Sequence, residues 1–389
     1  MIELHRLPIS ELVINDKVRG SQHDVAVWNL NLDQIEANSG RVLEKVKVAP
    51  DKLGPSTYPF AAGTVLYSKL RPYLNKVVVA DEDGYATTEL VPLKCNPQKV
   101  LPSYLAYFLR SDGFVSFANT VVAGAKMPRM VMSEFWRYKV PIPSIPEQRR
   151  ITAILDQADD LRAKRREALA QLDALAQSIF MEMFGDPVAN SKKWPEVRLG
   201  EHTTKMGSGS TPSGGDAAYK DSGISLIRSL NVHDGRFLYK NLAFIDDQQA
   251  KKLANVKVEA NDILLNITGA SVARVCRAPA DVLPARVNQH VMIIRPGVSL
   301  NSAFLERLLL TPAMKIKLLQ IGGAGATREA ITKAQAEELS IICPPMALQN
   351  EFEQRLSIVQ KIAASQSESL REMSSMFASL EHRAFSGAL

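Results

Sequence analysis

The chain has 389 residues, of which 46% are hydrophobic and 23% charged, a composition that excludes a disordered chain and allows two or three folded domains. No apolar run reaches the roughly 18 residues that a membrane-spanning helix needs, and the opening MIELHRLPIS lacks the apolar core of a signal peptide. We therefore expect a cytoplasmic protein with no membrane partner. The formal net charge of +6 permits a polyanionic partner such as nucleic acid, although many soluble enzymes are equally basic.

The first half of the chain predicts short strands followed by helices. Strands are expected at 64–68, 75–80 and 88–94, because β-branched and apolar runs flank a proline-containing break. A helical stretch follows at 101–120, then a glycine-containing loop and a short strand that ends in prolines. From Ile151 to Ile179, apolar residues recur at alternating spacings of three and four. This pattern predicts one long helix, which Gly185 ends.

The second half repeats the same order of elements. Strands are expected at 262–266, 272–278 and 288–295, a helical stretch at 301–320, and a second long helix whose 3–4 spacing runs from Phe352 and which Gly387 ends. Each half is therefore expected to form a mixed α/β globule with a helical arm. Arg165 and Gln366 occupy equivalent positions in the two arms, where a polar side chain either fixes the register of paired helices or lies at a wet edge.

Identical residues recur at a constant offset, which supports a tandem duplication. A shift of 201 residues aligns Pro143 with Pro344 and Gln148 with Gln349, and it gives eleven identical pairs between 123 and 184, against roughly four expected from typical composition. Further upstream, a shift of 198 places GTVLYSKLRPYLNKVVVA over NDILLNITGASVARVCRA. The register is constant over long stretches, so the chain is interpreted as two copies of one unit.

The catalytic motifs that we searched for are absent from the sequence. There is no Gly-Lys dipeptide for a phosphate-binding Walker A loop, and no GxSxG nucleophile elbow. The six histidines are scattered without metal-ligand spacing, and the three cysteines stand far apart. We therefore expect no catalytic residue, no metal site and no cofactor bound by this chain.

Polar loops with basic side chains occur in both copies, and this recurrence suggests DNA contact. Such loops let amides, hydroxyls and guanidinium groups reach phosphates and base edges, although for any single residue a solvated surface is the simpler interpretation. The predicted DNA-contacting residues are Lys69, Arg71, Lys76, Lys126 and Arg129 in the first copy, and Ser208, Ser210, Arg228, Asn231, Asn266, Thr268, Arg274 and Arg328 in the second.

Three stretches resemble one known family, the specificity subunits of Type I restriction-modification systems. They are LYSKLRPYLNKVVVA, the long run from IPSIPEQRRI to FGDP, and WPEVRLGEHTTKMGSGSTP with the later NDILLNITGA. The resemblance runs from about residue 40 to the end of the chain. It implies an α+β fold with two tandem target-recognition domains, at 1–145 and 187–345, each followed by a long helix, at 146–186 and 346–389. The two helices are expected to pack as an antiparallel coiled coil.

The resemblance also implies a function without catalysis by this chain. Each globule would read one half of an asymmetric bipartite site in double-stranded DNA, and the helices would act as spacer and as docking site for methyltransferase subunits. Those partners would use S-adenosylmethionine for adenine methylation, and a restriction and translocation subunit, if present, would use ATP and Mg²⁺. The helix residues expected to dock partners are Gln148, Ile151, Leu155, Leu172, Gln349, Phe352, Leu356 and Leu370.

The first copy lacks the opening WPEVRLG of the second, so the first forty residues are not assigned. Two alternatives remain open at this point. The chain could be the specificity chain of another methyltransferase–nuclease assembly, or a coiled-coil interaction protein that binds no DNA. Salt-dependent, sequence-selective DNA binding would separate the last class from the others.

Overall fold

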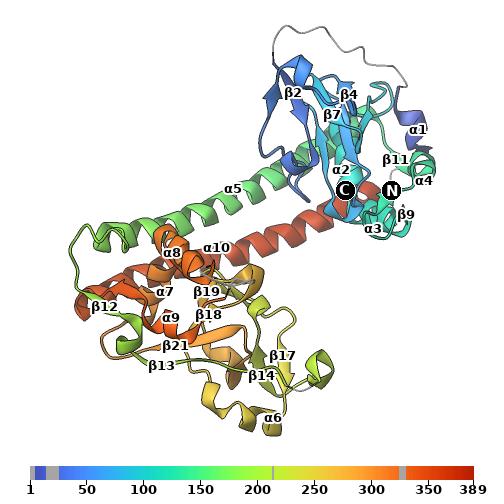
Figure 1. Ribbon diagram of the computed structural model, residues 1–389. Coiled ribbons are helices and arrows are strands. Elements are labelled where there is room, and N and C mark those ends of the chain that lie inside the picture. The colour runs from blue at the N-terminus through green and yellow to red at the C-terminus, as the bar shows by residue number, and fades with distance from the viewer. Residues whose placement is uncertain (1–4, 15–25, 213, 324–329) are drawn as a thin grey trace. The chain divides into compact units, whose positions relative to one another are not determined.

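The computed structural model describes residues 5–14, 26–212, 214–323 and 330–389 (Figure 1). The chain forms two compact units, which are described separately below. Unit 1 comprises Met1–Arg166 and Glu368–Leu389, and unit 2 comprises Glu167–Ser367. Two long helices, α5 (Ile145–Phe184) and α10 (Met346–Ser386), each contribute residues to both units. None of the helices in the described part of the chain has the length and apolar character needed to cross a bilayer.

Unit 1 contains two main sheets and two short strand pairs. One sheet has the strand order β3-β2-β7-β4 and the other the order β6-β5-β8, while β1 pairs with β11 and β9 with β10. The strands are β1 (His5–Pro8), β2 (Val27–Leu30), β3 (Lys47–Val48), β4 (Thr57–Phe60), β5 (Val65–Ser68), β6 (Val77–Val79), β7 (Gly84–Thr87), β8 (Leu90–Leu93), β9 (Val122–Ala123), β10 (Arg129–Met130) and β11 (Lys139–Ile142). The short helices are α1 (Ile9–Leu12), α2 (Pro102–Arg110), α3 (Asp112–Thr120) and α4 (Met132–Arg137).

Unit 2 has the corresponding arrangement. Its sheets have the orders β13-β21-β18-β19 and β17-β14-β20, and β12 pairs with β22 and β15 with β16. The strands are β12 (Glu196–Arg198), β13 (Thr203–Ser208), β14 (Ile224–Ile227), β15 (Val232–His233), β16 (Arg236–Phe237), β17 (Ala243–Ile245), β18 (Ile263–Asn266), β19 (Val275–Arg277), β20 (Ala285–Val287), β21 (Val291–Pro296) and β22 (Ser340–Ile342). The short helices are α6 (Asp247–Lys252), α7 (Ser302–Leu310), α8 (Pro312–Gly323) and α9 (Lys333–Glu337).

The central hairpin of each unit lies between two apolar clusters. Along β5, Val65 and Tyr67 enter one cluster and Leu66 enters the other, and every residue of this strand is buried. In unit 2, Ile263 and Leu265 enter one cluster and Leu264 the other. Successive side chains of a strand point to opposite faces, so a continuous apolar run fits a strand that is covered on both sides. The predicted hairpins are confirmed, since β5 pairs antiparallel with β6 and β18 with β19.

Each predicted helical stretch is in fact a pair of helices. In unit 1, Ser111 separates α2 from α3 and its hydroxyl accepts a hydrogen bond from the amide of Phe114. In unit 2, Thr311 takes the same place before Pro312, and its hydroxyl accepts from the amide of Met314. A short hydroxyl side chain in extended backbone satisfies the free amides of a new helix start, so it ends one helix and begins the next.

The duplication extends into the first forty residues, which the sequence left unassigned. Strand β1 pairs antiparallel with β11, with Leu7 opposite Val140, and β12 pairs in the same way with β22, with Val197 opposite Ile341. Farther on, β2 runs parallel to β7 and β14 runs parallel to β20. The first copy therefore has the opening strand of the second, built from a different sequence.

The long helices attach to the units through aromatic side chains. In unit 1, Phe385 of α10 packs edge-on against Tyr104 and Phe108 of α2, at centroid distances of 5.5 and 5.2 Å. In unit 2, Phe184 of α5 lies 4.9 Å from Phe304 of α7. The helices end where predicted, because Gly185 and Gly387 adopt positive φ angles of 77° and 78°, a conformation that glycine adopts without strain.

The two long helices run in opposite directions within unit 1. Arg150, near the start of α5, donates to the carbonyl oxygen of Leu389 at 2.9 Å, whereas Arg162, farther along α5, lies 4.2 Å from the ring centroid of Phe377 in α10. In unit 2, Phe180 of α5 packs edge-on against Phe352 of α10 at 5.6 Å. The α+β class with two long helices is thus confirmed.

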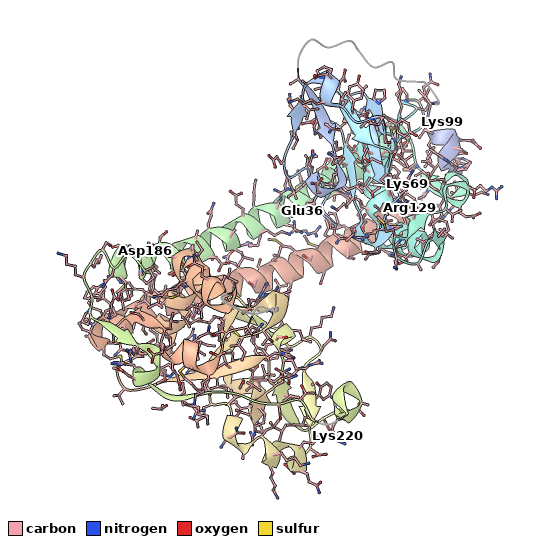
Figure 2. The ribbon with its side chains drawn as sticks, viewed as in Figure 1. Glu36, Lys69, Lys99, Arg129, Asp186 and Lys220 are labelled. Atoms are coloured by element: carbon pink, nitrogen blue, oxygen red, sulfur yellow. The ribbon has the colours of Figure 1, made fainter. Side chains whose placement is uncertain are left out.

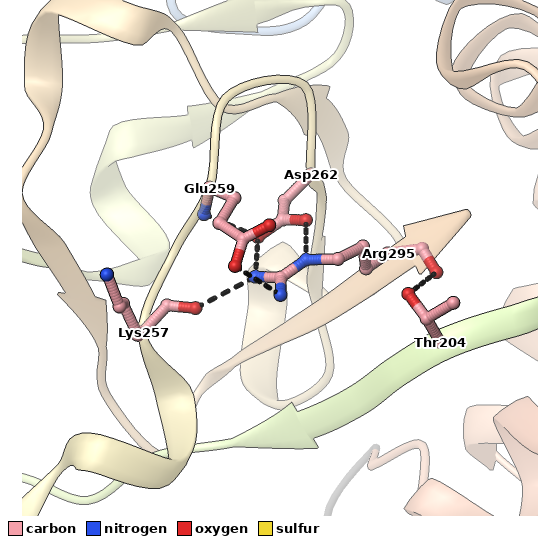
Figure 3. Close-up of polar contacts among 5 residues, drawn as sticks. All are labelled: Thr204, Lys257, Glu259, Asp262 and Arg295. Atoms are coloured by element: carbon pink, nitrogen blue, oxygen red, sulfur yellow. Dashed lines mark hydrogen bonds and ion pairs between the residues drawn. The ribbon is translucent and has the colours of Figure 1, made fainter. Parts of the chain in front are cut away.

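Charged side chains fix one loop of unit 2 to its central sheet (Figure 3). The guanidinium of Arg295 on β21 binds the carboxylate of Asp262 through Nε at 2.7 Å and Nη2 at 2.9 Å, and it reaches Glu259 through Nη1 at 2.7 Å. Asp262 is 1% exposed and also accepts a hydrogen bond from the amide of Glu259 at 2.7 Å. The donors of Arg295 and of the Glu259 amide occupy both oxygens of this buried carboxylate, so the network is structural.

Candidate nucleic-acid interface

Three separate segments of unit 1 meet at one loop edge, which we call edge 1 and define as residues 69–71, 88–89 and 124–129. The amide of Lys69 donates to the carbonyl of Glu89 at 3.0 Å, and the amide of Arg71 donates to the carbonyl of Pro128 at 2.7 Å. Leu70 and Arg129 form an isolated antiparallel bridge. Lys69 and Arg129 accordingly lie close together in Figure 2. The structure thus brings together four predicted DNA-contacting residues, Lys69, Arg71, Lys126 and Arg129.

The cations of edge 1 differ in how they are held. Arg71 and Lys126 are exposed, and neither side chain has a hydrogen-bond or ion-pair partner among the described residues. Arg71 sits in the left-handed region with φ of 51°, so the backbone turns sharply there. Arg129 is held by Glu89, whose carboxylate accepts from Nη2 at 2.8 Å and from Nε at 3.1 Å. This pairing raises the pKa of Arg129, first through the hydrogen bond and then through the charge of Glu89.

Lys76, the fifth predicted residue of the first copy, points into unit 1. Its ammonium donates to the carbonyl oxygen of Leu32 at 2.5 Å, and the side chain is half-buried. Leu32 begins the short helical turn Leu32–Gln34, so this hydrogen bond ties Lys76 to the turn that follows β2. The structure therefore places Lys76 in a supporting position and not among the exposed cations of edge 1.

Unit 2 has an equivalent loop edge, which we call edge 2 and define as residues 209–211, 267–268, 288–290 and 330. The amide of Ile267 donates to the carbonyl of His290 at 3.0 Å, and Thr268 forms an isolated bridge with Ala330. The amide of Gly209 donates to the carbonyl of Asn288 at 3.0 Å. Of the residues predicted in the second copy, edge 2 contains Ser210 and Thr268, while Ser208 ends the adjoining strand β13.

Two predicted contacts of unit 2 lie inside the domain, and the prediction for them is corrected. Asn231 and Asn266 are both 0% exposed. Asn231 donates to the carbonyl of Leu238 at 2.9 Å, and Asn266 donates to the carbonyl of Ser229 at 2.9 Å. Buried amides of this kind satisfy loop carbonyls that water cannot reach. Their side chains shape the loops next to edge 2 and do not reach a DNA surface.

The remaining predicted residues of unit 2 have varied surroundings. Arg228 donates to the carbonyl of Asn241 at 2.7 Å and lies 5.0 Å from the ring centroid of Tyr219, so it is engaged within the unit. Arg274 is half-buried, and its charge acts on the nearby Lys315, whose pKa is lowered mainly by burial. Arg328 lies outside the described residues. The predicted DNA contacts at Ser208, Ser210, Thr268 and Arg274 stay predictions.

Sequence reasoning missed several polar residues of the two edges. Glu89, Gln289 and His290 were assigned to strands, and Thr211 lay in a polar stretch but was not named as a contact. In the structure, His290 shares a short hydrogen bond of 2.6 Å with Thr268, and Gln289 is exposed beside it. The sequence did contain a signal that Glu89 and His290 are equivalent, because extending the 201-residue shift to the third strand aligns them.

Six of the eight predicted partner-docking residues are buried in their own units. Gln148 and Gln349 are 0% exposed, and Ile151, Leu155, Phe352 and Leu356 are at most 3% exposed. Leu172 packs partly buried against a core cluster, and Leu370 is half-buried. This corrects the prediction for the six buried residues, since a residue buried in its own unit offers a partner no surface, whereas docking at Leu172 and Leu370 stays a prediction. The large apolar side chains that α5 and α10 expose are Leu161, Leu175, Met181, Ile358, Ile362 and Met376.

Within the described residues, no group of three or more His, Cys, Asp or Glu side chains is placed to hold a metal ion. Burial raises the pKa of the Cys95 and Cys276 thiols to about 12, which keeps them protonated and unreactive. What the geometry offers is two equivalent loop edges that carry polar and basic side chains. Such a surface is suited to binding.

The fold and these edges define a protein of two tandem α+β domains that present similar loops on a duplicated frame. Residues 54–171 match the family model of the Type I restriction modification DNA specificity domain. The chain is 27% identical over 156 residues to the Type I restriction enzyme EcoDI specificity subunit of Escherichia coli, covering 39% of this chain and 34% of that protein. It is 24% identical over 333 residues to the putative MjaX specificity subunit of Methanocaldococcus jannaschii, covering 78% and 73%.

A solved chain from a study of complex assembly and conformational transition in the type I R-M system has the same fold. Its TM-score is 0.58 at 19% sequence identity, and the alignment covers 99% of this chain and 98% of that chain. In sequence, the chain is thus similar to specificity subunits of Type I restriction enzymes, and residues 54–171 match the DNA specificity domain of that family.

Proposed function

We propose that the chain reads DNA for a Type I restriction-modification complex, with edge 1 binding one half of a bipartite duplex site and edge 2 the other. The observation that carries this proposal is the repetition of the edge. The bridge between Leu70 and Arg129 in unit 1 has its counterpart between Thr268 and Ala330 in unit 2. Equivalent frames with different side chains suit two different half-sites, so the recognised sequence is asymmetric.

The exposed cations of edge 1 support the binding of a polyanion. Arg71 and Lys126 are not neutralised within the described residues, so they release counterions when they meet phosphates. Hydroxyl and amide side chains dominate edge 2, with Ser210, Thr211, Thr268 and Gln289. Edge 2 therefore relies more on hydrogen bonding than on charge.

The long helices would act as spacer and as docking surface for methyltransferase subunits. Ile358 and Ile362 are 62% and 46% exposed on one part of α10, and Leu161 and Leu175 are 51% and 46% exposed on α5. Spacings of four along one helix place such side chains on the same face. Apolar stripes of this kind favour a partner that covers them.

Catalysis belongs to the partners in this proposal. Methyltransferase subunits would transfer the methyl group from S-adenosylmethionine to adenine, and a restriction subunit, where present, would use ATP and Mg²⁺. This chain would contribute sequence selection and geometry alone, in the cytoplasm, where the chromosome and the partners are found.

The test is base-resolution mapping of adenine methylation in the source cell with and without this chain. We expect one bipartite, asymmetric motif to lose its methyl marks when the chain is removed and to regain them when it is restored. Co-purification with a methyltransferase in the same cells checks the docking role. An unchanged methylome in cells where that methyltransferase is active would overturn the proposal.

A further inference from the structure

One side-chain position is equivalent in the two edges and carries different chemistry in each. Strand pairing sets Tyr67 opposite Val91 in unit 1 and Leu265 opposite Met292 in unit 2. Two residues before Val91 and Met292, respectively, the chain reaches Glu89 and His290, whose carbonyls accept hydrogen bonds from equivalent amides at 3.0 Å. The two residues therefore have the same strand pairing and the same backbone hydrogen bond, and they differ in their side chains and neighbours.

In unit 1 the residue at this position, Glu89, holds Arg129 in a fixed orientation. Glu89 accepts from two nitrogens of Arg129, Nη2 at 2.8 Å and Nε at 3.1 Å. The side chain of Glu89 is 23% exposed and that of Arg129 is 44% exposed. A guanidinium has five N–H donors, and the described residues use two of them here. The carboxylate thus fixes the plane of the guanidinium, while Nη1 and one Nη2 hydrogen stay available at the surface.

In unit 2 the equivalent residue, His290, holds the amide of the neighbouring Gln289 within a chain of hydrogen bonds. The Thr211 hydroxyl donates to Gln289 Oε1, Gln289 Nε2 lies 3.0 Å from His290 Nε2, and His290 Nδ1 lies 2.6 Å from Thr268 Oγ1. Because the amide nitrogen can only donate, His290 Nε2 accepts and His290 Nδ1 carries the proton that Thr268 receives. Gln289 is exposed, and it keeps one N–H and one lone pair of Oε1 for an outside partner.

These two arrangements match the two bidentate ways of reading purines. An arginine fork donates twice to guanine O6 and N7, whereas a glutamine amide donates to N7 and accepts from N6 of adenine. A side chain held by neighbours loses less freedom on binding than a mobile one. The preorganised partners, Glu89 in unit 1 and Thr211 with His290 in unit 2, therefore favour base reading over loose phosphate contact.

We propose that Arg129, oriented by Glu89, reads a guanine in one half-site, and that Gln289, oriented by Thr211 and His290, reads an adenine in the other. The inference rests on the proposed DNA-reading function and adds which residue reads which base. Arg129 and Gln289 touch the base, whereas Glu89, Thr211 and His290 are positioning residues. Arg71 and Lys126 contact phosphates and carry no base preference.

The experiment uses the full chain with its methyltransferase partner and maps the methylated motif for wild type, Arg129→Gln, Gln289→Ala and Lys126→Gln. We expect Arg129→Gln to relax one guanine position of a single half-site by about tenfold or more in base preference. Gln289→Ala should relax one adenine position in the other half-site. Lys126→Gln, as the matched control on edge 1, should leave the preference at every position unchanged.

Two conservative substitutions of Glu89 test whether it positions Arg129. Glu89→Gln keeps the shape but removes the charge that holds the guanidinium, and it should relax the same guanine position as Arg129→Gln, while Glu89→Asp should retain most of the preference. A merely structural role would lower occupancy at all sites equally. Thermal melting of each variant, with its methyltransferase bound, separates misfolding from loss of reading.

The outcomes are distinguishable. If wild type shows no sequence-selective motif at all, the proposed function fails. If wild type shows a bipartite motif but Arg129→Gln and Gln289→Ala weaken methylation without changing any base preference, the inference fails and the two residues are phosphate contacts. If both variants alter the same half-site, the assignment of one base reader to each unit is wrong.

Discussion

Gln148 and Gln349, 201 residues apart, make the same three hydrogen bonds in their two units. Gln148 Nε2 donates to the carbonyls of Lys99 and Pro143 at 2.8 and 2.9 Å, and its Oε1 accepts from the amide of Leu101 at 2.9 Å. Gln349 does the same with the carbonyls of Ser299 and Pro344 and the amide of Asn301. Both side chains are 0% exposed. Each glutamine joins the start of a long helix to the loop before a short helix, α2 or α7.

Replacing Gln148 with leucine should destabilise unit 1. The substitution leaves one amide and two carbonyls buried without partners, and each such group costs free energy because water cannot replace the lost bond. We expect a loss of about 2–4 kcal/mol in the free energy of unfolding. Hydrogen exchange of the full chain checks this, with reduced protection at the start of α5 and in the 99–101 loop.

Gln349→Leu is the matched control for that experiment. It should reduce protection at the start of α10 and around 299–301 and leave unit 1 unchanged. Equal loss of protection in both units for either variant would contradict the idea that each glutamine stabilises its own unit.

The stability of unit 1 should depend on pH through Glu381. This residue of α10 is 7% exposed, and in the 201-residue register it stands where unit 2 has Phe180. Burial, followed by the charge of Asp112, raises its pKa from 4.5 to about 7, while Arg110 and Arg162 oppose the shift. The folded unit therefore holds a proton that the unfolded chain releases above its ordinary pKa.

The direction in which stability changes with pH follows from that difference in bound protons. Between pH 4.5 and 7 the unfolded state binds fewer protons than the folded state, so stability falls as pH rises. Glu381→Gln removes the titration, and we expect the variant to match wild type near pH 4, below the ordinary pKa, and to exceed it by up to about 3 kcal/mol at pH 8. Thermal unfolding at the two pH values checks this. If the difference in stability between wild type and variant is the same at both pH values, Glu381 does not titrate in this range.

Much of the fold could be predicted from the sequence, because its hydrophobic patterns are strong. The buried run of β5 and the 3–4 spacing from Ile151 gave the hairpin and the helix, and the glycines at 185 and 387 gave the helix ends. The opening strand at His5–Pro8 was missed because its partner β11 lies far along the chain, and four residues without an apolar pattern carry no local signal. Tertiary pairing alone defines that strand.

The candidate site was predictable only in part. Basic residues in loops marked edge 1 correctly as a place where cations gather, since loops lie at the surface. The same reasoning failed for Asn231 and Asn266, because a polar residue in a loop satisfies buried carbonyls as readily as it faces solvent, and sequence does not distinguish the two. Glu89 and His290 were missed because their role depends on which loop lies beside them.

The exposed apolar side chains of α10 should be required for partner docking. We expect the double variant Ile358→Ser and Ile362→Ser to lose co-purification with the methyltransferase by about tenfold or more, since two large side chains leave the interface. The variant should fold, because 62% and 46% of these side chains are already in water. Co-purification from cells that express both subunits measures this. Ala364→Ser, exposed on the same helix, is the control, and equal recovery of both variants would place the docking surface elsewhere.

Charge removal at edge 1 should weaken DNA binding without changing sequence preference. Arg71 and Lys126 are exposed and have no partner among the described residues, so each is free to replace counterions on a phosphate. For Arg71→Gln and Lys126→Gln we expect affinity to fall severalfold at moderate salt, and the slope of log affinity against log salt to decrease by about one for each residue. Titration of a duplex that carries the mapped motif, and of a scrambled duplex, measures both effects. Lys361→Gln on α10 removes the same charge from unit 2 and serves as the control. If its effect equals that of Lys126→Gln, the net charge of the chain is responsible and edge 1 is not the phosphate-binding surface.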